Sequence, residues 1–324
     1  MIEIPTLALS PGLPYNHPLL ELLLMSKRSV RKDGKSWSSA EKETLVTSLQ
    51  RTMIALGYST TTSGACVIDG DFGNGTNRGM AQAIYDLTSD GRLVNHQTVP
   101  TRKELTPKCT WQNSAVVARD LCGVAVTARV VEAMFKYVKE KPSKLLGGDP
   151  VTARRQLDAI ERGRLDDKGA AMAGYRMESA WVSKWNDIRP AWLMAVVLTE
   201  TGGINRPRFE QHYFSRLARE YRTKSLREIR FLSMSMGLGQ IMGVNYKAAG
   251  AESPEDLFTA DTRDQLSFIA NFLDPMRHIT MKLDPSDNDF RKIAKYYNGP
   301  GYAKNNYDKK LKKHFNDEKT KFES

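Results

Sequence analysis

One glutamate in this sequence ends an apolar segment, where a carboxylic acid could do chemistry. The segment Trp192–Gly203 reads WLMAVVLTETGG and predicts a helix that starts at Pro190 and ends at the two glycines. Glu200 would share a helix face with Trp192 and Val196. Apolar neighbours and the negative end of the helix dipole both disfavour ionisation, so we expect a raised pKa. A carboxyl group that is still protonated near neutral pH can protonate a glycosidic oxygen.

A second carboxylate, Glu210, follows ten positions later, after a loop with glycine and proline. A sharp loop could place it opposite Glu200, and glycoside hydrolysis commonly uses two carboxyl groups about 5–9.5 Å apart. Plainer interpretations stay open: Glu200 as a surface residue of a last helical turn, and Glu210 as a helix cap or an ion-pair partner of Arg206 or Arg208. His212 is more typical of packing or hydrogen bonding, since no Ser-His-Asp arrangement or metal-binding pattern surrounds it.

Two glycine-containing segments further along could approach a ligand closely. Ser233–Gly243 reads SMSMGLGQIMG, in which glycines let the backbone come near a ligand and methionines form a flexible apolar wall. Gln240 offers a donor and an acceptor to a sugar hydroxyl or acetamide. The second segment, Tyr296–Gly301, reads YYNGPG and ends a helix expected over Phe290–Tyr297.

Helical patterns surround these candidates. Residues 151–189 are helical in pattern and strongly charged, with Trp181 and Trp185 four positions apart, a spacing that favours core packing over a sugar platform. Asp261–Leu273 is amphipathic, and a basic helix follows the last glycines, with a run at Lys309–Lys313 that is usually a solvated face.

The N-terminal half predicts two helices joined by a turn. Ser38 or Ser39 would cap a helix over Glu41–Leu56, and Thr76 would cap a second one over Asn77–Leu87. The turn between them resembles that of the small peptidoglycan-binding domain of many wall hydrolases, a three-helix bundle. The residues that carry the resemblance are Leu49-Gln50, Leu56-Gly57-Tyr58, Asp69-Gly70, Phe72-Gly73 and Thr76.

That resemblance implies wall binding by Tyr58, Asp69, Gly70 and Phe72. It departs after Thr76, where the usual apolar-aromatic pair is replaced by Met80, Ala83 and Ile84. The alternative is a purely structural helix–turn–helix without a ligand. A calcium loop is disfavoured, because Gly73 and Met80 fall where oxygen ligands are needed.

Three blocks in the second half are similar to those of soluble lytic transglycosylases and goose-type lysozymes, and closest to the N-acetylmuramidase domain of phage endolysins. They are Glu200–Gly203 (ETGG), Gly237–Met242 (GLGQIM) and Tyr296–Gly301 (YYNGPG), supported by Arg208–Glu210 (RFE). The resemblance implies cleavage of the β-1,4 bond between N-acetylmuramic acid and N-acetylglucosamine. It places the catalytic acid at Glu200. The residues expected to contact the sugar are Ser235, Gln240, Met242, Tyr297 and Asn298.

The predicted fold class is therefore mainly α, with a three-helix peptidoglycan-binding bundle and a helical lysozyme-like domain. The expected domains are an arm at 1–37, the wall-binding domain with a helical extension at 38–140, a linker at 141–164 and the catalytic domain at 165–324. Glu210 favours hydrolysis over the lytic transglycosylase reaction, which needs one glutamate only. An inactive wall-binding protein is the rival class.

The composition is strongly basic, which favours binding to polyanions. The net charge is +11 in 324 residues, and the pI is about 9.4. No nucleic-acid motif accompanies the charge, and the three cysteines Cys66, Cys109 and Cys122 form neither a disulfide framework nor a metal site. We expect no cofactor, no metal, no nucleic acid, no stable membrane insertion and no peptidase chemistry. The expected partner is bacterial peptidoglycan, and the protein is expected to be a monomer. No export signal is visible, so we expect synthesis in the host cytoplasm and action on the wall or periplasm after release by a holin.

Overall fold

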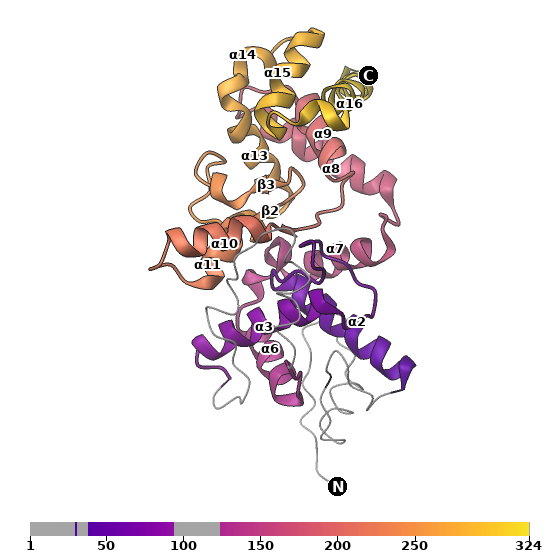
Figure 1. Ribbon diagram of the computed structural model, residues 1–324. Coiled ribbons are helices and arrows are strands. Elements are labelled where there is room, and N and C mark those ends of the chain that lie inside the picture. Colours follow the sequence, from indigo (N-terminus) through magenta and orange to yellow (C-terminus); the bar gives the residue numbers. More distant parts are fainter. Residues whose placement is uncertain (1–29, 31–37, 94–123, 324) are drawn as a thin grey trace. The chain divides into compact units, whose positions relative to one another are not determined.

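The computed structural model describes Val30 and residues 38–93 and 124–323 (Figure 1). The chain is mostly helical, which confirms the predicted fold class. It divides into two compact units. Unit 1 comprises Met1–Glu161 and Pro207–Met234, and unit 2 comprises Arg162–Arg206 and Ser235–Ser324. The segment 207–234, which lies inside the predicted catalytic domain, thus clusters with the N-terminal half. The predicted arm at 1–37 lies, except for Val30, outside the described residues.

The N-terminal helices of unit 1 follow the predicted pattern closely. They are α2 (Ser39–Ala55), α3 (Asn74–Ser89) and α6 (Ala128–Glu140), and α3 packs against the other two. Helix α2 buries Leu45, Leu49 and Met53 on one face and is followed by Gly57 at a φ of +84°. Helix α3 begins before the predicted cap. The Thr76 hydroxyl lies in its first turn and hydrogen-bonds loop carbonyls, so it does not serve as the N-cap.

The amide of Gln50 holds the turn in the loop between α2 and α3. Its Nε2 donates to Asp69 Oδ1 (2.7 Å) and to the carbonyl of Asp71 (3.0 Å), and its Oε1 accepts from the backbone N–H groups of Asp69 and Gly70 (both 3.0 Å). Gly70 has a φ of +71°, which favours glycine there. Phe72 is buried beneath this loop. The sequence motif therefore encodes a folded turn.

The segment expected as a linker, 141–164, is folded. It contains two 3₁₀ turns, Pro142–Lys144 and Leu146–Gly148, and helix α7 (Pro150–Arg162). The Asp149 carboxylate accepts hydrogen bonds from the N–H groups of Val151 (2.8 Å) and Thr152 (2.9 Å) at the start of α7. Glycine and proline thus act here as helix-end signals.

The second piece of unit 1 carries strand β1 (Arg208–Phe209) and helices α10 (Gln211–Glu220) and α11 (Leu226–Leu232). The Phe209 N–H donates to the carbonyl of Gly64 (2.8 Å). Arg230 is fully buried, pairs with Asp86 (2.7 Å), and lies 4.1 Å from the centre of the Tyr58 ring. The Tyr58 hydroxyl also donates to Asp86 (2.7 Å). This buried charged cluster joins the two pieces of unit 1.

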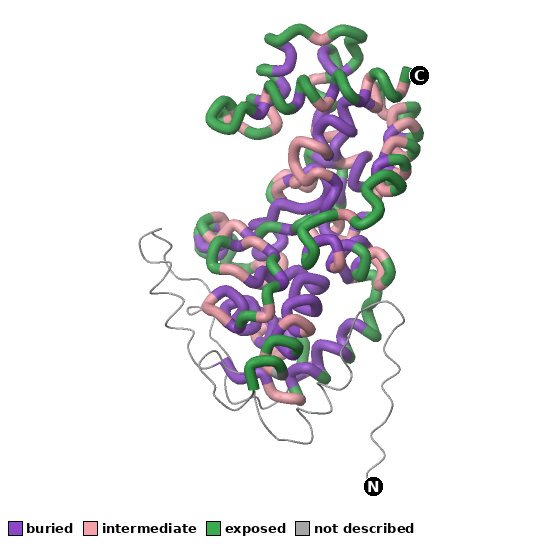
Figure 2. Tube along the Cα trace, turned by 90° about the vertical axis from the view of Figure 1, so that its right-hand side faces the viewer, coloured by how far each residue is buried: buried purple, intermediate pink, exposed green. Residues whose placement is uncertain are grey.

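Unit 2 is built around helix α9 (Pro190–Glu200), every residue of which from Ala191 to Val197 is buried. It packs against α8 (Lys168–Ser183), α13 (Thr262–Leu273) and α16 (Tyr307–Glu323), and Figure 2 shows buried and exposed residues alternating along the helices. The Trp192 ring lies 5.0 Å from Phe290 and 4.6 Å from Phe315 between ring centres. The remaining elements are η4 (Gly243–Asn245), α12 (Asp256–Thr259), η5 (Asp274–Met276), α14 (Arg277–Thr280), α15 (Asp287–Asn298) and η6 (Tyr302–Asn305).

The segment Ser233–Gly243 forms a short antiparallel hairpin that its sequence pattern does not predict. Strand β2 (Met234–Met236) pairs with β3 (Ile241–Met242), in a register that places Ser235 opposite Met242. The turn between them uses left-handed backbone at Gly237 (φ +76°) and Gln240 (φ +49°). Among the described residues, no helix is both long and apolar enough to cross a membrane.

Candidate active site

Glu200 is the last residue of α9, and the chain turns sharply after it. Gly202 and Gly203 have φ values of +60° and +92°. The positive φ of Gly203 favours glycine, and a Cβ atom there would also press on the Met172 methyl group (2.3 Å) and the Tyr175 ring (3.1 Å). The Tyr175 hydroxyl donates to the Gly203 carbonyl (2.9 Å) and holds the turn against α8.

The Glu200 carboxyl group is half-buried and has one hydrogen-bond donor beside it. Burial raises its pKa from 4.5 to about 7, and the hydrogen bond from Tyr307 opposes that rise. The Tyr307 hydroxyl lies 2.5 Å from Glu200 Oε1. The predicted raised pKa is confirmed, with burial as its main cause. A carboxyl group with a pKa near 7 is able to give a proton and to take one back at neutral pH.

Two tyrosines remain protonated around this carboxyl group. Burial and the Glu200 charge raise the pKa of Tyr297 and of Tyr307 well above 10. Tyr297 donates its hydroxyl hydrogen to the carbonyl of Gly239 (2.7 Å). Both hydroxyls therefore stay neutral near neutral pH and can donate hydrogen bonds.

The glycine-containing turn lies against the end of α9. The Thr201 hydroxyl donates to the Leu238 carbonyl (3.0 Å), and the Leu238 N–H donates to Gln265 Oε1 (2.8 Å) on α13. A Cβ atom on Gly239 would lie 2.6 Å from the Tyr297 hydroxyl and 2.5 Å from Ile269, so only glycine fits. Residues from α9, the hairpin, α15 and α16 thus meet at one place in unit 2.

The predicted sugar-contact residues are found at and around this place. Tyr297 takes part directly, as described. The Gln240 side chain donates to the carbonyls of Arg206 (3.1 Å) and Gly237 (3.0 Å), so its amide nitrogen is engaged within the protein. Ser235 is buried, Met242 is half-buried and Asn298 is exposed. Their contact with a sugar stays a prediction.

Tyr307 was not among the predicted site residues. Its position could have been found from the helical spacing of Tyr307, Leu311 and Phe315, which lie on one buried face of α16. The basic residues between them make the segment look like a solvated helix, so the buried face was not recognised. The hydroxyl's partner, 107 positions earlier in the chain, had no local signal.

Glu210 belongs to unit 1, at the N-cap position of α10. Its side chain makes no capping hydrogen bond, so the cap interpretation is wrong. Its carboxylate lies 3.1 Å from Arg208 Nε and 3.7 Å from His212 Nδ1, which agrees with the ion-pair interpretation. His212 itself is exposed, and its ring lies tilted against that of Tyr213, with 4.6 Å between ring centres. A catalytic role for Glu210 stays a prediction.

The predicted wall-binding residues build the fold of unit 1. Tyr58 and Phe72 are buried, and Asp69 and Gly70 form the turn that Gln50 holds. Of these side chains only that of Asp69 is exposed. Wall binding by this module therefore stays a prediction. Within the described ranges, no group of three or more His, Cys, Asp or Glu residues could hold a metal ion.

Comparison with known proteins identifies the domain that surrounds much of this site. Residues 223–319 match the family model described as N-acetylmuramidase. The chain therefore carries a muramidase domain in its C-terminal part, as predicted, and is an enzyme of the peptidoglycan-hydrolase class. The match includes Gln240, Tyr297 and Tyr307 and begins after Glu200.

No curated protein matches the chain. Among solved structures, the crystal structure of Burkholderia AP3 phage endolysin is 16% identical, with 92% of this chain and 100% of that chain covered and a TM-score of 0.37. A TM-score of that size does not establish a shared fold.

Proposed function

We propose that this protein is a phage endolysin that cleaves the β-1,4 bond between N-acetylmuramic acid and N-acetylglucosamine, with Glu200 as the general acid. The observation that carries the proposal is the Glu200 carboxyl group. Its pKa is raised to about 7 by burial, and it is hydrogen-bonded by Tyr307, a residue inside the stretch that matches the muramidase family. A peptidoglycan strand supplies the glycosidic oxygen that such an acid protonates.

The chemical step follows from the protonation states. Protonated Glu200 gives its proton to the glycosidic oxygen as the bond between that oxygen and the anomeric carbon breaks. The carboxylate left behind receives the Tyr307 hydrogen bond, which is stronger to a charged acceptor than to a neutral one. A water then adds its oxygen to the anomeric carbon and releases a proton to a base.

Replacing the acid by its neutral isostere tests the proposal. We expect Glu200→Gln to lower the release of soluble muropeptides from purified sacculi by at least about 10²-fold, because general-acid catalysis contributes roughly that much. The matched control is Glu252→Gln, an exposed glutamate of the same unit, which should retain full activity. Full activity of a folded Glu200→Gln protein would end the assignment.

The same digest separates hydrolysis from its alternative. A lytic transglycosylase lets the sugar's own 6-hydroxyl attack and leaves 1,6-anhydro-muramic ends, which are lighter by one water. We expect reducing ends in the mass spectrum. Anhydro ends would reject hydrolysis, while they would leave Glu200 as the acid.

Release to the wall is part of the same proposal. The resemblance to phage endolysins implies synthesis in the host cytoplasm and passage to the wall through a holin. Expression with and without a co-expressed holin tests this. Lysis that needs the holin supports the route, and lysis at the same rate without it contradicts the route.

A further inference from the structure

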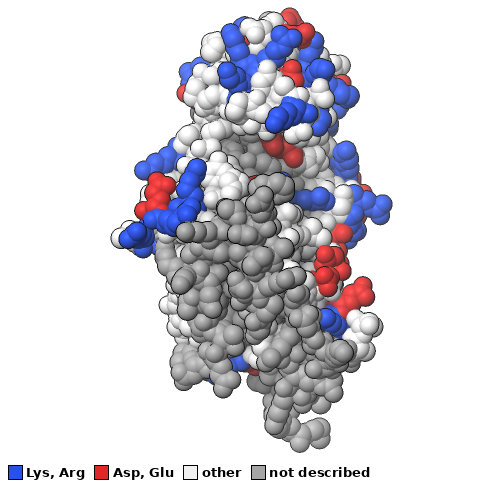
Figure 3. All heavy atoms as spheres, viewed as in Figure 1, with Lys and Arg blue, Asp and Glu red and all other residues white. Residues whose placement is uncertain are grey.

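Positive charge in unit 2 is concentrated in one segment next to the candidate active site. Residues 291–313 contain eight basic residues and one acidic residue, a net charge of +7. The rest of unit 2 has 13 basic and 17 acidic residues, a net charge of −4. We call the eight basic side chains the basic surface; they are Arg291, Lys292, Lys295, Lys304, Lys309, Lys310, Lys312 and Lys313. In Figure 3 blue outnumbers red on the part of the surface that carries α14–α16.

These side chains are available to a partner. All eight are exposed. Lys312 pairs with Asp287 (2.5 Å) and Lys313 with Asp317 (2.6 Å), whereas the other six form no ion pair with a carboxylate of the described residues. Unpaired cations this close together repel one another, so an anionic partner would relieve that repulsion.

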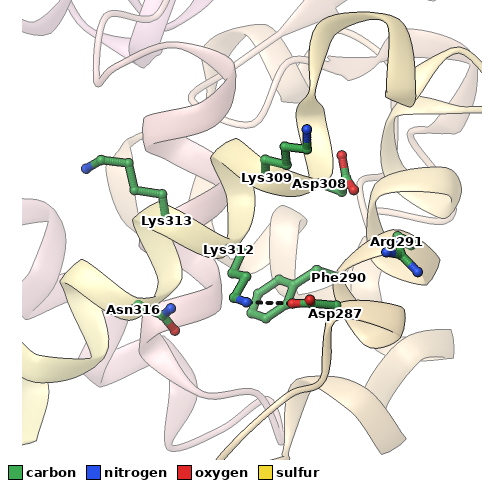
Figure 4. A pocket seen from close by; sticks show the side chains of 8 residues that line it. All are labelled: Asp287, Phe290, Arg291, Asp308, Lys309, Lys312, Lys313 and Asn316. Carbon is green, nitrogen blue, oxygen red and sulfur yellow. Dashed lines mark hydrogen bonds and ion pairs between the residues drawn. The ribbon is translucent and has the colours of Figure 1, made fainter.

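A pocket of about 360 Å³ opens within this surface, between α15 and α16. That volume lies within the range of pockets that hold small ligands. Phe290 forms its apolar floor, and Figure 4 shows Lys312 reaching across to Asp287 beside that ring, while Lys313 points away. The polar lining is mixed; it consists of Asp287, Arg291, Asp308, Lys309, Lys312, Lys313 and Asn316.

We propose that the basic surface and its pocket bind the peptide stem of the same peptidoglycan strand whose sugar lies at Glu200. This inference rests on the proposed function. In peptidoglycan each N-acetylmuramic acid carries a short peptide with free carboxylates and, on its diamino acid, a free amine. The pocket offers cations to the carboxylates, Asp308 to the amine and the Asn316 amide to the peptide groups. A phosphate polymer would instead meet repulsion from Asp287 and Asp308.

The geometry of α16 allows the peptide to reach the pocket. Tyr307, Leu311 and Phe315 face the helix's buried side, where Tyr307 meets Glu200, whereas Lys309, Lys312 and Asn316 lie on the opposite, exposed side. A helix with its side chains is about 10–12 Å across. A tetrapeptide extends to roughly 13–14 Å, because each residue spans at most about 3.3–3.6 Å. A stem attached at the sugar is therefore long enough to pass around the first turn of α16.

Glycan strands with and without peptide test the inference. The peptide-bearing strands come from sacculi freed of cross-links, and part of them is stripped with an amidase. The variant is Arg291→Glu/Lys309→Glu, two pocket residues without an ion pair. The control, Lys168→Glu/Lys184→Glu, makes the same charge change at exposed residues of unit 2 outside the basic surface.

We expect the pocket variant to raise KM for peptide-bearing strands about fivefold or more, since reversal turns two weak attractions into repulsions. Its kcat and its KM for stripped strands should equal those of the wild type, as should every constant of the control. An equal change on both substrates, or no change, would overturn the inference. So would a variant that loses binding to anionic phospholipid vesicles while its KM for both strands is unchanged. A wild type that cleaves neither strand would instead refute the proposed function.

Discussion

The Glu200 carboxyl group shows what one residue's surroundings do to its chemistry. The apolar run before it was enough to predict the direction of its pKa shift, because burial in a helix of apolar residues leaves a charge without water. The opposing partner, Tyr307, could not be predicted the same way. It lies in a basic stretch 107 positions away, and only the packing of α16 on α9 brings the hydroxyl to Glu200.

The pH dependence of the reaction tests this pairing. The general acid must be protonated, so we expect the wild-type rate to fall as pH rises through about 7. In Tyr307→Phe the hydrogen bond that lowers the Glu200 pKa is gone, so the alkaline limb should move to higher pH, with a lower maximum rate. Tyr85→Phe, a half-buried tyrosine of unit 1, is the control and should leave the profile unchanged. An alkaline limb of Tyr307→Phe at the wild-type position would show that Tyr307 does not act on Glu200.

The same pKa predicts a pH-dependent stability. Because folding raises the Glu200 pKa from 4.5 to about 7, the folded state favours the protonated form. The stability this contributes is complete below pH 4.5 and is lost as pH rises through about 7, in total about 3 kcal/mol. Glu200→Gln cannot ionise, so its melting temperature should exceed that of the wild type at pH 8 and should match it more closely at pH 5. A melting-temperature difference that is the same at both pH values would contradict the burial of this group.

At the scale of elements, the helices could be predicted because their signals are local. Asp261 accepts from the Asp264 N–H at the start of α13, and Ser286 and Asp289 form a capping box at the start of α15. The β2–β3 hairpin had no such signal. Both strands are short, and the run SMSMGLGQIM is almost wholly buried, so no polar face marked it as a strand.

The hairpin turn makes a prediction at this scale. Gly239→Ala puts a methyl group against the Tyr297 hydroxyl and Ile269, so we expect a loss of about 1–3 kcal/mol in the free energy of unfolding. Activity should fall as well, because Tyr297 is displaced. Gly174→Ala in α8 is the matched control, since nothing lies within 4 Å of its added carbon. Urea unfolding measures both, and a Gly239→Ala protein as stable as Gly174→Ala would contradict the close packing.

At the scale of the whole molecule, the predicted domain boundaries differ from the two units of the structure, because unit 1 includes a segment from the predicted catalytic domain. Residues 207–234 lie between two catalytic motifs in the sequence, yet they pack with residues far upstream through Arg230, Asp86 and Tyr58. The sequence around Arg230 could not predict its pairing with Asp86, because the tertiary fold sets the partner of a buried charge. Residues 94–123 lie outside the described residues.

The shared unit predicts that the chain does not divide at the expected linker. Removing residues 1–161 would leave Arg230 without Asp86, and breaking a buried pair costs about 3–5 kcal/mol. In the fragment 162–324 we therefore expect the segment 207–234, with α10 and α11, to be unfolded, while unit 2 keeps its own core. In the full chain, Asp86→Ala should be destabilised by a similar amount, whereas Asp90→Ala, an exposed neighbour, should not. Slow hydrogen exchange of the α10 and α11 amides in the fragment would refute the shared core.

The division of the chain into two units also predicts the result of limited proteolysis. The polypeptide passes from one unit to the other three times, after Glu161, after Arg206 and after Met234. After a single cut at any of these passages, two chain connections between the units remain, and the packing inside each unit holds the two fragments together. Several cuts would be needed to separate unit 2, which carries Glu200, from unit 1. We therefore expect limited digestion to yield cleaved molecules that still migrate as one particle until a denaturant is added.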